Sequence, residues 1–197
     1  MRFPWQLNYQ VTKYLIGKKL KGEKRFPIVL MLEPTHICNL TCEGCGRIRE
    51  YAKTLHEMVP LEECLKVSDE CGAPVISICG GEPLLYPQIG ELVTELVNIK
   101  KHIYLCTNAL HLEKKLHLFT PSPYFNINIH LDGMAKTHDG IVNRNGVFDI
   151  AIKAIKASLA KGFRVYTNTK NNKFYKRVLL ETPKLHGDGK EPSKKTT

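Results

Sequence analysis

Residues 36–47 read HICNLTCEGCGR, and they place Cys38, Cys42 and Cys45 in a C-x₃-C-x₂-C arrangement. A structural zinc site usually takes four ligands, and a disulfide takes two. Iron–sulfur clusters are held by cysteine thiolates, normally four of them for a 4Fe–4S cube. Three cysteines would leave one iron open to an exogenous ligand, as catalytic metal centres do. Three thiolates at this spacing would therefore suit a 4Fe–4S cluster with one open iron.

The alternative for the same stretch is a zinc site that uses His36 as its fourth ligand. A short cysteine spacing of this kind is not diagnostic alone, so this alternative has to be tested against the surrounding sequence. A zinc site of four protein ligands would make the chain a zinc-stabilised binding module without catalysis.

Short apolar runs alternate with segments of helical periodicity on both sides of the cysteines. The runs predict strands at 28–32, 74–79, 102–106, 124–131 and 163–167. The periodic segments predict helices at 4–21, 60–71, 86–100, 110–118 and 148–161. Such alternation is typical of βαβ units and a parallel sheet. The predicted fold class is α/β, a partial (β/α) barrel with about five βα units.

Composition divides the chain into three parts. Residues 1–27 form a basic amphipathic helix, residues 28–169 form the barrel core, and residues 170–197 form a basic tail. The tail is rich in Lys, Pro, Gly and Ser, and such a composition does not order itself alone. A barrel would continue past residue 169, so we expect the C-terminal part of the barrel to be missing.

The net charge of +10 is unevenly placed. Residues 1–27 carry seven Lys and Arg against one acidic residue, and residues 170–197 carry eight against three, whereas the middle carries fourteen against fifteen. A nucleic-acid binder usually spreads its basic residues over a folded face, so we expect no nucleic-acid partner.

The sequence shows no signal-peptide pattern at its N-terminus and no apolar run long enough to cross a bilayer, so we expect a cytoplasmic protein. The seven cysteines are an odd number, which rules out a complete disulfide framework within one chain.

Polar or thiol residues follow the end of every predicted strand. In parallel βα folds the functional site lies at the carboxyl ends of the strands. The candidates there are Gly80, Gly81 and Glu82 after the second strand, Cys106 and Asn108 at the third, and His130 and Asp132 at the fourth. Each also has an ordinary interpretation: a glycine turn, a small buried cysteine, a histidine bonded to a carbonyl, and an Asp-Gly turn.

The three cysteines after the first strand, with GGE at 80–82 after the second, resemble the radical S-adenosylmethionine (SAM) superfamily. The resemblance implies that SAM chelates the open iron and that an electron from the cluster cleaves it to a 5′-deoxyadenosyl radical. It implies that Gly80 and Gly81 let the backbone approach SAM and that Glu82 faces the SAM ammonium group. Asn108, His130 and Asp132 become candidates for contacts with the ribose and adenine.

Longer strings narrow the resemblance. VLMLEP at 29–34, DECGAPVISICGGEPLL at 69–85, YLCTNALHLEKKLHLFTPSPY at 104–124 and GVFDIAIKAIK at 146–156 are similar to the adenosylhopane synthase group of hopanoid biosynthesis. That group is a transferase of lipid metabolism that adds the adenosyl radical to the alkene of diploptene. The resemblance implies a reducing partner such as flavodoxin or ferredoxin.

The addition leaves a tertiary carbon radical that must be quenched. We interpret Cys106 as the catalytic hydrogen-atom donor, because it stands at the strand end where substrate and SAM should meet. Cys79 adds a thiol beside the GGE turn, with no role that the sequence assigns. The alternatives are another radical SAM enzyme that abstracts hydrogen, and an inactive truncated chain.

A lipid substrate raises the question of membrane contact. The helix at 4–21 could lie on the inner face of the membrane as a peripheral contact, with Trp5, Leu7, Val11 and Leu15 inserted. It could instead pack against the barrel, as most amphipathic helices do, and we favour this interpretation.

Overall fold

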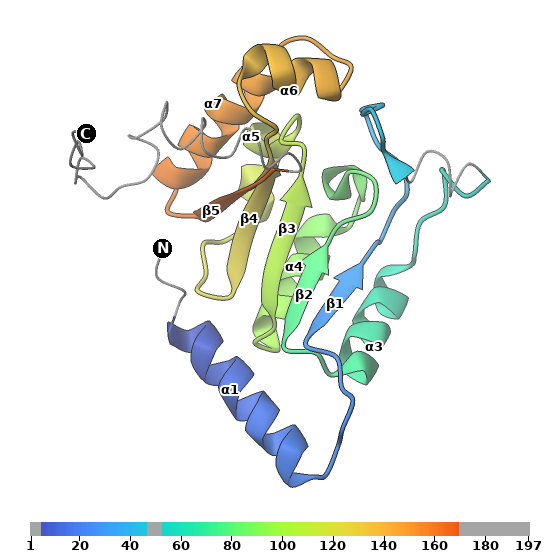
Figure 1. The fold of residues 1–197 in the computed structure, drawn as a ribbon, viewed down its shortest axis with the longest axis vertical. Coiled ribbons are helices and arrows are strands. Elements are labelled where there is room, and N and C mark those ends of the chain that lie inside the picture. Colours follow the sequence, from blue (N-terminus) through green and yellow to red (C-terminus); the bar gives the residue numbers. More distant parts are fainter. Residues whose placement is uncertain (1–4, 47–52, 170–197) are drawn as a thin grey trace, which may run out of the picture.

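A computed structural model describes residues 5–46 and 53–169 (Figure 1). Five parallel strands form one sheet in the order β1-β2-β3-β4-β5. The strands are β1 (Val29–Leu32), β2 (Val75–Ile78), β3 (His102–Thr107), β4 (Phe125–His130) and β5 (Arg164–Asn168). Each predicted strand therefore exists, and sequential order with parallel pairing confirms the α/β fold of a partial (β/α) barrel.

The helices alternate with the strands: one precedes β1, and the others lie between successive strands. They are α1 (Trp5–Leu20), α3 (Leu61–Cys71), α4 (Ile89–Asn98), α5 (Leu112–Lys115), α6 (Ala135–Ile141) and α7 (Val147–Ala160), with 3₁₀ turns at η1 (Pro83–Leu85) and η2 (Leu116–Leu118). Helices α3, α4 and α7 pack against β1, β3 and β5. The main core lies between them and the sheet, and its fully buried members include Ile76, Ile78, Leu92, Leu96, Leu105 and Ile127.

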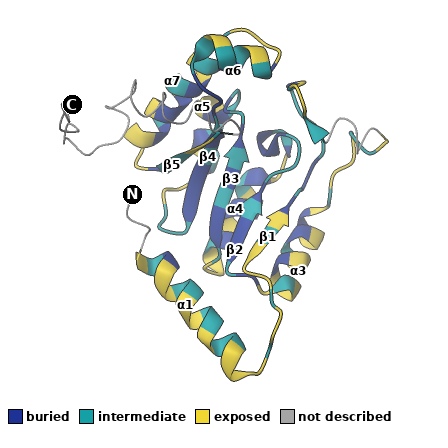
Figure 2. Ribbon diagram, viewed as in Figure 1, coloured by how far each residue is buried: buried dark blue, intermediate teal, exposed yellow. Residues whose placement is uncertain are grey.

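The opposite side of the sheet, the inner face, carries the alternate residues of each strand. Leu32 of β1 is buried in the core, but Val29 and Met31 on the same strand are 51% and 68% exposed. Figure 2 shows much of β1 as exposed, unlike the neighbouring strand β2. Met31 pairs in register with Ser77, so both side chains belong to the inner face.

Helix α1 lies at the amino end of this inner face. Leu7 is its one buried residue among those described, and a cavity of about 370 Å³ is lined by Leu7, Val11, Val75 and Tyr104, together with Asn8 and Thr12. The helix therefore packs against the barrel, as favoured. Of the four residues that the membrane alternative would insert, Leu7 is buried and Val11 and Leu15 are half-buried, whereas Trp5 is exposed. Within the described ranges, no helix is long and apolar enough to cross a membrane.

The differences from the sequence prediction lie at the element ends. Pro60 is the N-cap of α3 and not its first helical residue, and the helix expected at 110–118 is split into α5 and η2. Helix α6 and turn η1 were not predicted. The predicted tail at 170–197 lies outside the described residues, so the division into three parts stays a prediction.

Candidate functional site

A cavity of about 210 Å³ opens at the carboxyl ends of the strands, where parallel βα folds place their sites. Nine of the ten predicted site residues line it: Cys38, Cys42, Cys45, Gly80, Gly81, Glu82, Cys106, Asn108 and His130. The tenth, Asp132, lies behind His130. Residues as far apart in the sequence as Cys38 and Asn168 thus meet in one place.

The cysteine loop is held from the side of α6. Leu40 is buried against Val142 and Val147, with Cys38 and Cys42 packed beside them. The Glu43 amide donates to the Ile141 carbonyl at 2.7 Å. These contacts fix the loop that carries the thiols, since burying Leu40 removes its apolar surface from water.

The three thiols fit the donor set of an iron–sulfur cluster, because all three line the same cavity and cysteine thiolates are the usual ligands. Across residues 5–46 and 53–169, no three His, Cys, Asp or Glu side chains converge tightly enough to hold one metal ion. The assignment of Cys38, Cys42 and Cys45 as cluster ligands therefore stays a prediction.

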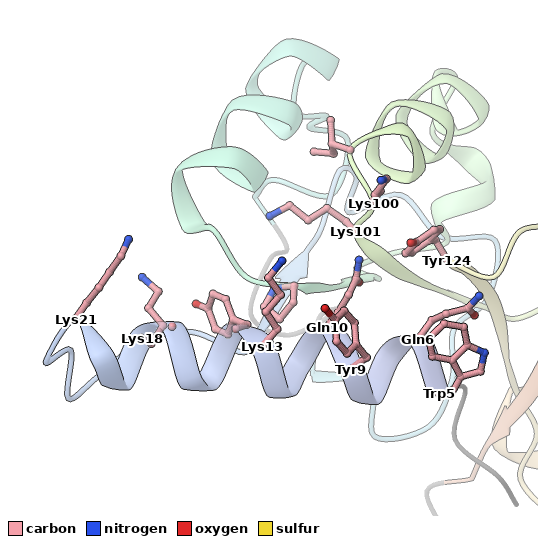
Figure 3. Close-up of a pocket in the computed structure, with 14 residues that line it drawn as sticks. Trp5, Gln6, Tyr9, Gln10, Lys13, Lys18, Lys21, Lys100, Lys101 and Tyr124 are labelled. Atoms are coloured by element: carbon pink, nitrogen blue, oxygen red, sulfur yellow. The ribbon is translucent and has the colours of Figure 1, made fainter.

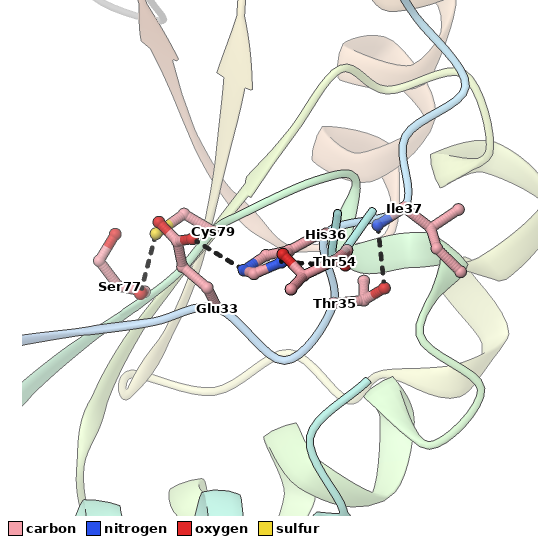
Figure 4. A network of polar contacts seen from close by, with 7 residues as sticks. All are labelled: Glu33, Thr35, His36, Ile37, Thr54, Ser77 and Cys79. Atoms are coloured by element: carbon pink, nitrogen blue, oxygen red, sulfur yellow. Dashed lines mark hydrogen bonds and ion pairs between the residues drawn. The ribbon is translucent and has the colours of Figure 1, made fainter. Parts of the chain in front are cut away.

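His36 is not among the residues that line this cavity. Its Nδ1 lies 3.1 Å from Thr54 Oγ1, and its Nε2 lies 3.7 Å from Glu33 (Figure 4). The ring is thus engaged by its own surroundings. This placement disfavours the zinc alternative, which needs His36 beside the three thiols.

Gly80 and Gly81 are required by the backbone that leads to the first cysteine. Gly80 has a φ of 103°, and a Cβ there would stand 2.7 Å from the Thr35 carbonyl oxygen. A Cβ on Gly81 would overlap the Ile37 carbonyl oxygen. Without side chains, the Gly81 amide donates to Thr35 O at 2.9 Å and the Glu82 amide donates to Ile37 O at 2.7 Å. The turn therefore ties β2 to the cysteine loop, and its predicted contact with SAM stays untested.

Glu82 is buried, with 1% of its surface exposed, and three donors of the chain surround its carboxylate. Oε1 accepts from the Leu84 amide at 3.0 Å and from Thr107 Oγ1 at 2.6 Å. Oε2 accepts from the Asn108 amide at 2.8 Å. Burial raises the pKa of the carboxyl, although these donors oppose the shift. A cation in the cavity would stabilise this buried charge, which fits the predicted pairing with an ammonium group.

Asn108 joins the end of β3 to the cysteine loop. Its Nδ2 donates to Asn39 Oδ1 at 2.7 Å and lies 4.0 Å from Cys38 Sγ. Its Oδ1 accepts from the Leu110 amide at 3.1 Å. The side chain thus braces the loop beside a predicted cluster ligand, and its predicted contact with SAM stays untested.

Cys106 projects from β3 onto the inner face. Its Sγ lies 3.4 Å from Ser77 Oγ and 3.6 Å from Asn128 Nδ2. Cys79 follows β2 beside it, and burial together with the nearby Glu33 raises the pKa of the Cys79 thiol to about 12. Both thiols therefore line the same cavity as Cys38, Cys42 and Cys45.

His130 and Asp132 form a pair at the end of β4, with Nε2 and Oδ2 2.9 Å apart. The buried His138 supports them, because its Nδ1 accepts from the Asp132 amide at 3.1 Å. Burial and the neighbouring His130 lower the pKa of His138. Asp139 accepts from the amides of Gly146 and Phe148, which secures the start of α7.

Sequence reasoning missed Asn128 and Asn168, which also line the cavity. The run FNINIH at 125–130 carried the signal, because its alternation places Asn128 on the same face as His130. Sequence reasoning also missed Ser77, although the alternation in the run VISI at 75–78 places it on the inner face in the same way.

Comparisons with known proteins agree with this geometry. A family model described as the radical SAM superfamily matches residues 32–172, which is more than half of the chain. A GTP 3′,8-cyclase of Clostridium botulinum is 30% identical over 141 residues, covering 68% of this chain and 44% of that relative. The mycofactocin maturase MftC of Mycobacterium tuberculosis is 27% identical over 141 residues, covering 70% and 36%. This chain thus spans less than half the length of these curated relatives.

Solved structures share the fold. Streptococcus suis SuiB bound to SAM superposes with a TM-score of 0.67 at 20% identity, over 94% of this chain and 43% of that one. A second structure, anSMEcpe with bound SAM, gives 0.59 at 21% identity over 79% of this chain and 49% of that one. The names of the curated relatives do not support the narrower hopanoid group. The chain belongs to the radical SAM superfamily, whose members use a 4Fe–4S cluster and SAM.

Proposed function

We propose that the protein is a radical SAM transferase that joins the adenosyl group to the alkene of diploptene, forming adenosylhopane. The strings at 69–85 and 104–124 support this substrate by their resemblance to adenosylhopane synthases. The single observation that carries the proposal is the position of Cys106, whose thiol lines the cavity of the cluster cysteines and projects from the inner face.

Each predicted residue has a role in this scheme. Cys38, Cys42 and Cys45 would hold the cluster, and Glu82 would pair with the SAM ammonium group. When bound, the cluster and SAM together supply a 5′-deoxyadenosyl radical. Asn108, His130 and Asp132 would contact the ribose and adenine. A reductant such as flavodoxin or ferredoxin would supply the electron.

The inner face below the cavity suits an apolar substrate. Met31 and Val29 are exposed there, although apolar side chains of strands are normally covered. Tyr104 and Tyr166 add two rings on β3 and β5, with centroids 5.9 Å apart. A triterpene hydrocarbon would cover this surface, whereas a nucleotide or a charged peptide would leave it unused.

Cys106 completes the reaction. The new bond joins the 5′ carbon of the adenosyl group to the terminal alkene carbon of diploptene. It leaves an unpaired electron on the adjacent tertiary carbon. The Cys106 S–H gives its hydrogen atom to that carbon, and the sulfur keeps the unpaired electron. One electron from the reducing partner and one proton from water restore the thiol.

Product analysis tests this proposal. Anaerobically reconstituted protein is incubated with SAM, reductant and diploptene, and the products are separated by mass. An adenosyl–triterpene adduct supports addition, and Cys106→Ala should lower its yield at least about tenfold because the carbon radical lacks its donor. Free 5′-deoxyadenosine without an adduct would instead indicate a radical SAM enzyme that abstracts hydrogen from another substrate. The absence of both products would indicate that this chain is inactive.

A further inference from the structure

Helix α1 exposes a stripe of large apolar side chains on the side that faces away from the barrel. The exposed fractions are 72% for Trp5, 61% for Tyr9, 53% for Ile16 and 83% for Leu20. Their intervals of four and seven residues put them on one face of the helix. The buried Leu7 lies on the opposite face, so the helix is apolar on two sides.

A groove runs beside this stripe, between α1 and the amino end of the sheet (Figure 3). Its volume is about 770 Å³. Trp5 and Tyr9 belong to both the stripe and the groove. Five lysines line the groove, and in Figure 3 they come from both of its walls: Lys13, Lys18, Lys21, Lys100 and Lys101.

The charge of this region is almost wholly positive. Helix α1 contains no acidic residue. Glu23 is the one acidic residue of 1–27, and its carboxylate lies 2.6 Å from Lys18 Nζ. Lys101 Nζ donates to the Ala73 carbonyl at 2.9 Å, which keeps its cationic end beside the segment that leads into β2. A ligand for this surface therefore has to be apolar and anionic at once.

We propose that α1 lies flat on an anionic lipid bilayer, with the stripe of Trp5, Tyr9, Ile16 and Leu20 inserted at the interface. Among the lysines of the groove, Lys13, Lys21 and Lys100 would lie on lipid phosphates. Indole and phenol rings favour the boundary between headgroups and acyl chains, and clustered lysines favour anionic leaflets. The complementarity of charge argues for lipid against a second copy of this chain, whose matching stripe would bring the same lysines together. The proposal does not rest on the radical chemistry.

The bilayer would then meet the amino end of the sheet. The cysteine cavity lies at the carboxyl end, so it would face away from the membrane. The inner face, with Met31 and Tyr104, connects the two ends along the strands.

Sedimentation with vesicles tests the proposal and needs no catalytic turnover. Vesicles of phosphatidylglycerol and phosphatidylcholine are compared with vesicles of phosphatidylcholine alone. The protein should bind the anionic vesicles, and the double variant W5A/L20A should lose at least about tenfold in affinity because two inserted side chains are removed. The variant K13A/K21A should lose about fivefold for each lysine and most of the salt dependence.

A matched control replaces two exposed apolar residues elsewhere, Ile150 and Leu159 of α7, which are 40% and 44% exposed. I150A/L159A should bind like the parent protein, and circular dichroism should be unchanged in all variants. Equal binding to both kinds of vesicle, or equal losses in the α7 variant, would overturn the proposal. The proposal would also be overturned if the protein did not bind vesicles, and if W5A/L20A instead abolished either concentration-dependent dimerisation or binding to RNA.

Discussion

The two ends of the sheet are built differently. At the carboxyl end, the Gly81 and Glu82 amides and the Asn108 side chain tie the ends of β2 and β3 to residues 35–39, which carry the first cysteine, through bonds of 2.7 to 2.9 Å. At the amino end, Leu7 is the buried residue of α1 among the residues that the structure describes. The Tyr14 hydroxyl of α1 donates to the Pro27 carbonyl at 2.7 Å, which joins the helix to the segment before β1. The end proposed for chemistry is held by hydrogen bonds between its segments, and the end proposed for membrane contact is more exposed and has fewer such bonds.

This difference has a physical reason. A catalytic constellation has to hold its geometry closely, so its residues are locked by hydrogen bonds and packing. A surface that meets lipid needs exposed apolar and basic groups and little internal bracing. Substitutions at the carboxyl end should therefore cost more stability than substitutions at the amino end.

The largest effect is expected for Gly81→Ala. The new Cβ would overlap the Ile37 carbonyl, and backbone cannot move aside cheaply, so the variant should lose at least about 3 kcal/mol of unfolding free energy. Urea unfolding measures this. Gly140→Ala in α6 is the control, because a Cβ there meets nothing within 4 Å. Equal stability of the two variants would show that the turn is not packed against the cysteine loop.

Glu82→Gln should cost about 2 kcal/mol near neutral pH, because an amide NH₂ would face one of the two backbone donors. The sign of the pH dependence follows from burial, which raises the folded-state pKa above the ordinary 4.5. The folded protein then takes up the proton first as pH falls, so the parent gains stability and its advantage over Glu82→Gln should widen toward pH 4.5. The exposed Glu91→Gln is the control, and a gap that narrows on acidification would contradict the assignment.

The smallest effect concerns His102, at the amino end of β3. It is fully buried against Tyr124, and neither ring nitrogen has a hydrogen-bond partner among the described residues. Burial and Arg164 lower its pKa below 6.5, so the unfolded chain takes up the proton first and stability falls as pH drops through that value. His102→Phe should remove this slope, with a change under about 1 kcal/mol. A slope that survives would place its origin elsewhere, and the exposed His56→Phe controls for the new ring.

Much of the fold was predictable because hydrophobic periodicity is local. Runs such as VISI at 75–78 and HIYLC at 102–106 indicate buried strands even when the strands that pair with them are not known. Helix α6 was missed because AKTHDGI has no apolar stripe and is held by tertiary bonds around His138 and Asp132. Element boundaries such as Pro60 shifted by a residue, which is the usual fraying of such predictions.

The candidate site was predictable in its membership and less so in its contacts. Strand ends of a parallel sheet meet at one edge, so Cys106, Asn108 and His130 could be grouped from order alone. The requirement for glycine at position 81 could not be predicted from the sequence. It arises because the Ile37 carbonyl approaches Gly81, and that approach depends on how the cysteine loop folds back on the end of β2. The exposed stripe of α1 was missed because the sequence does not say which of two apolar faces packs inward.

The most direct test of the central claim is electron paramagnetic resonance of anaerobically reconstituted, reduced protein with and without SAM. We predict a reduced-cluster signal that changes when SAM is added, that is lost in Cys42→Ala and that persists in Cys71→Ala. A reduced-cluster signal that is unchanged by SAM would contradict the claim that this cavity holds a cluster with an iron open to SAM. Zinc without iron or sulfide would contradict the cluster itself.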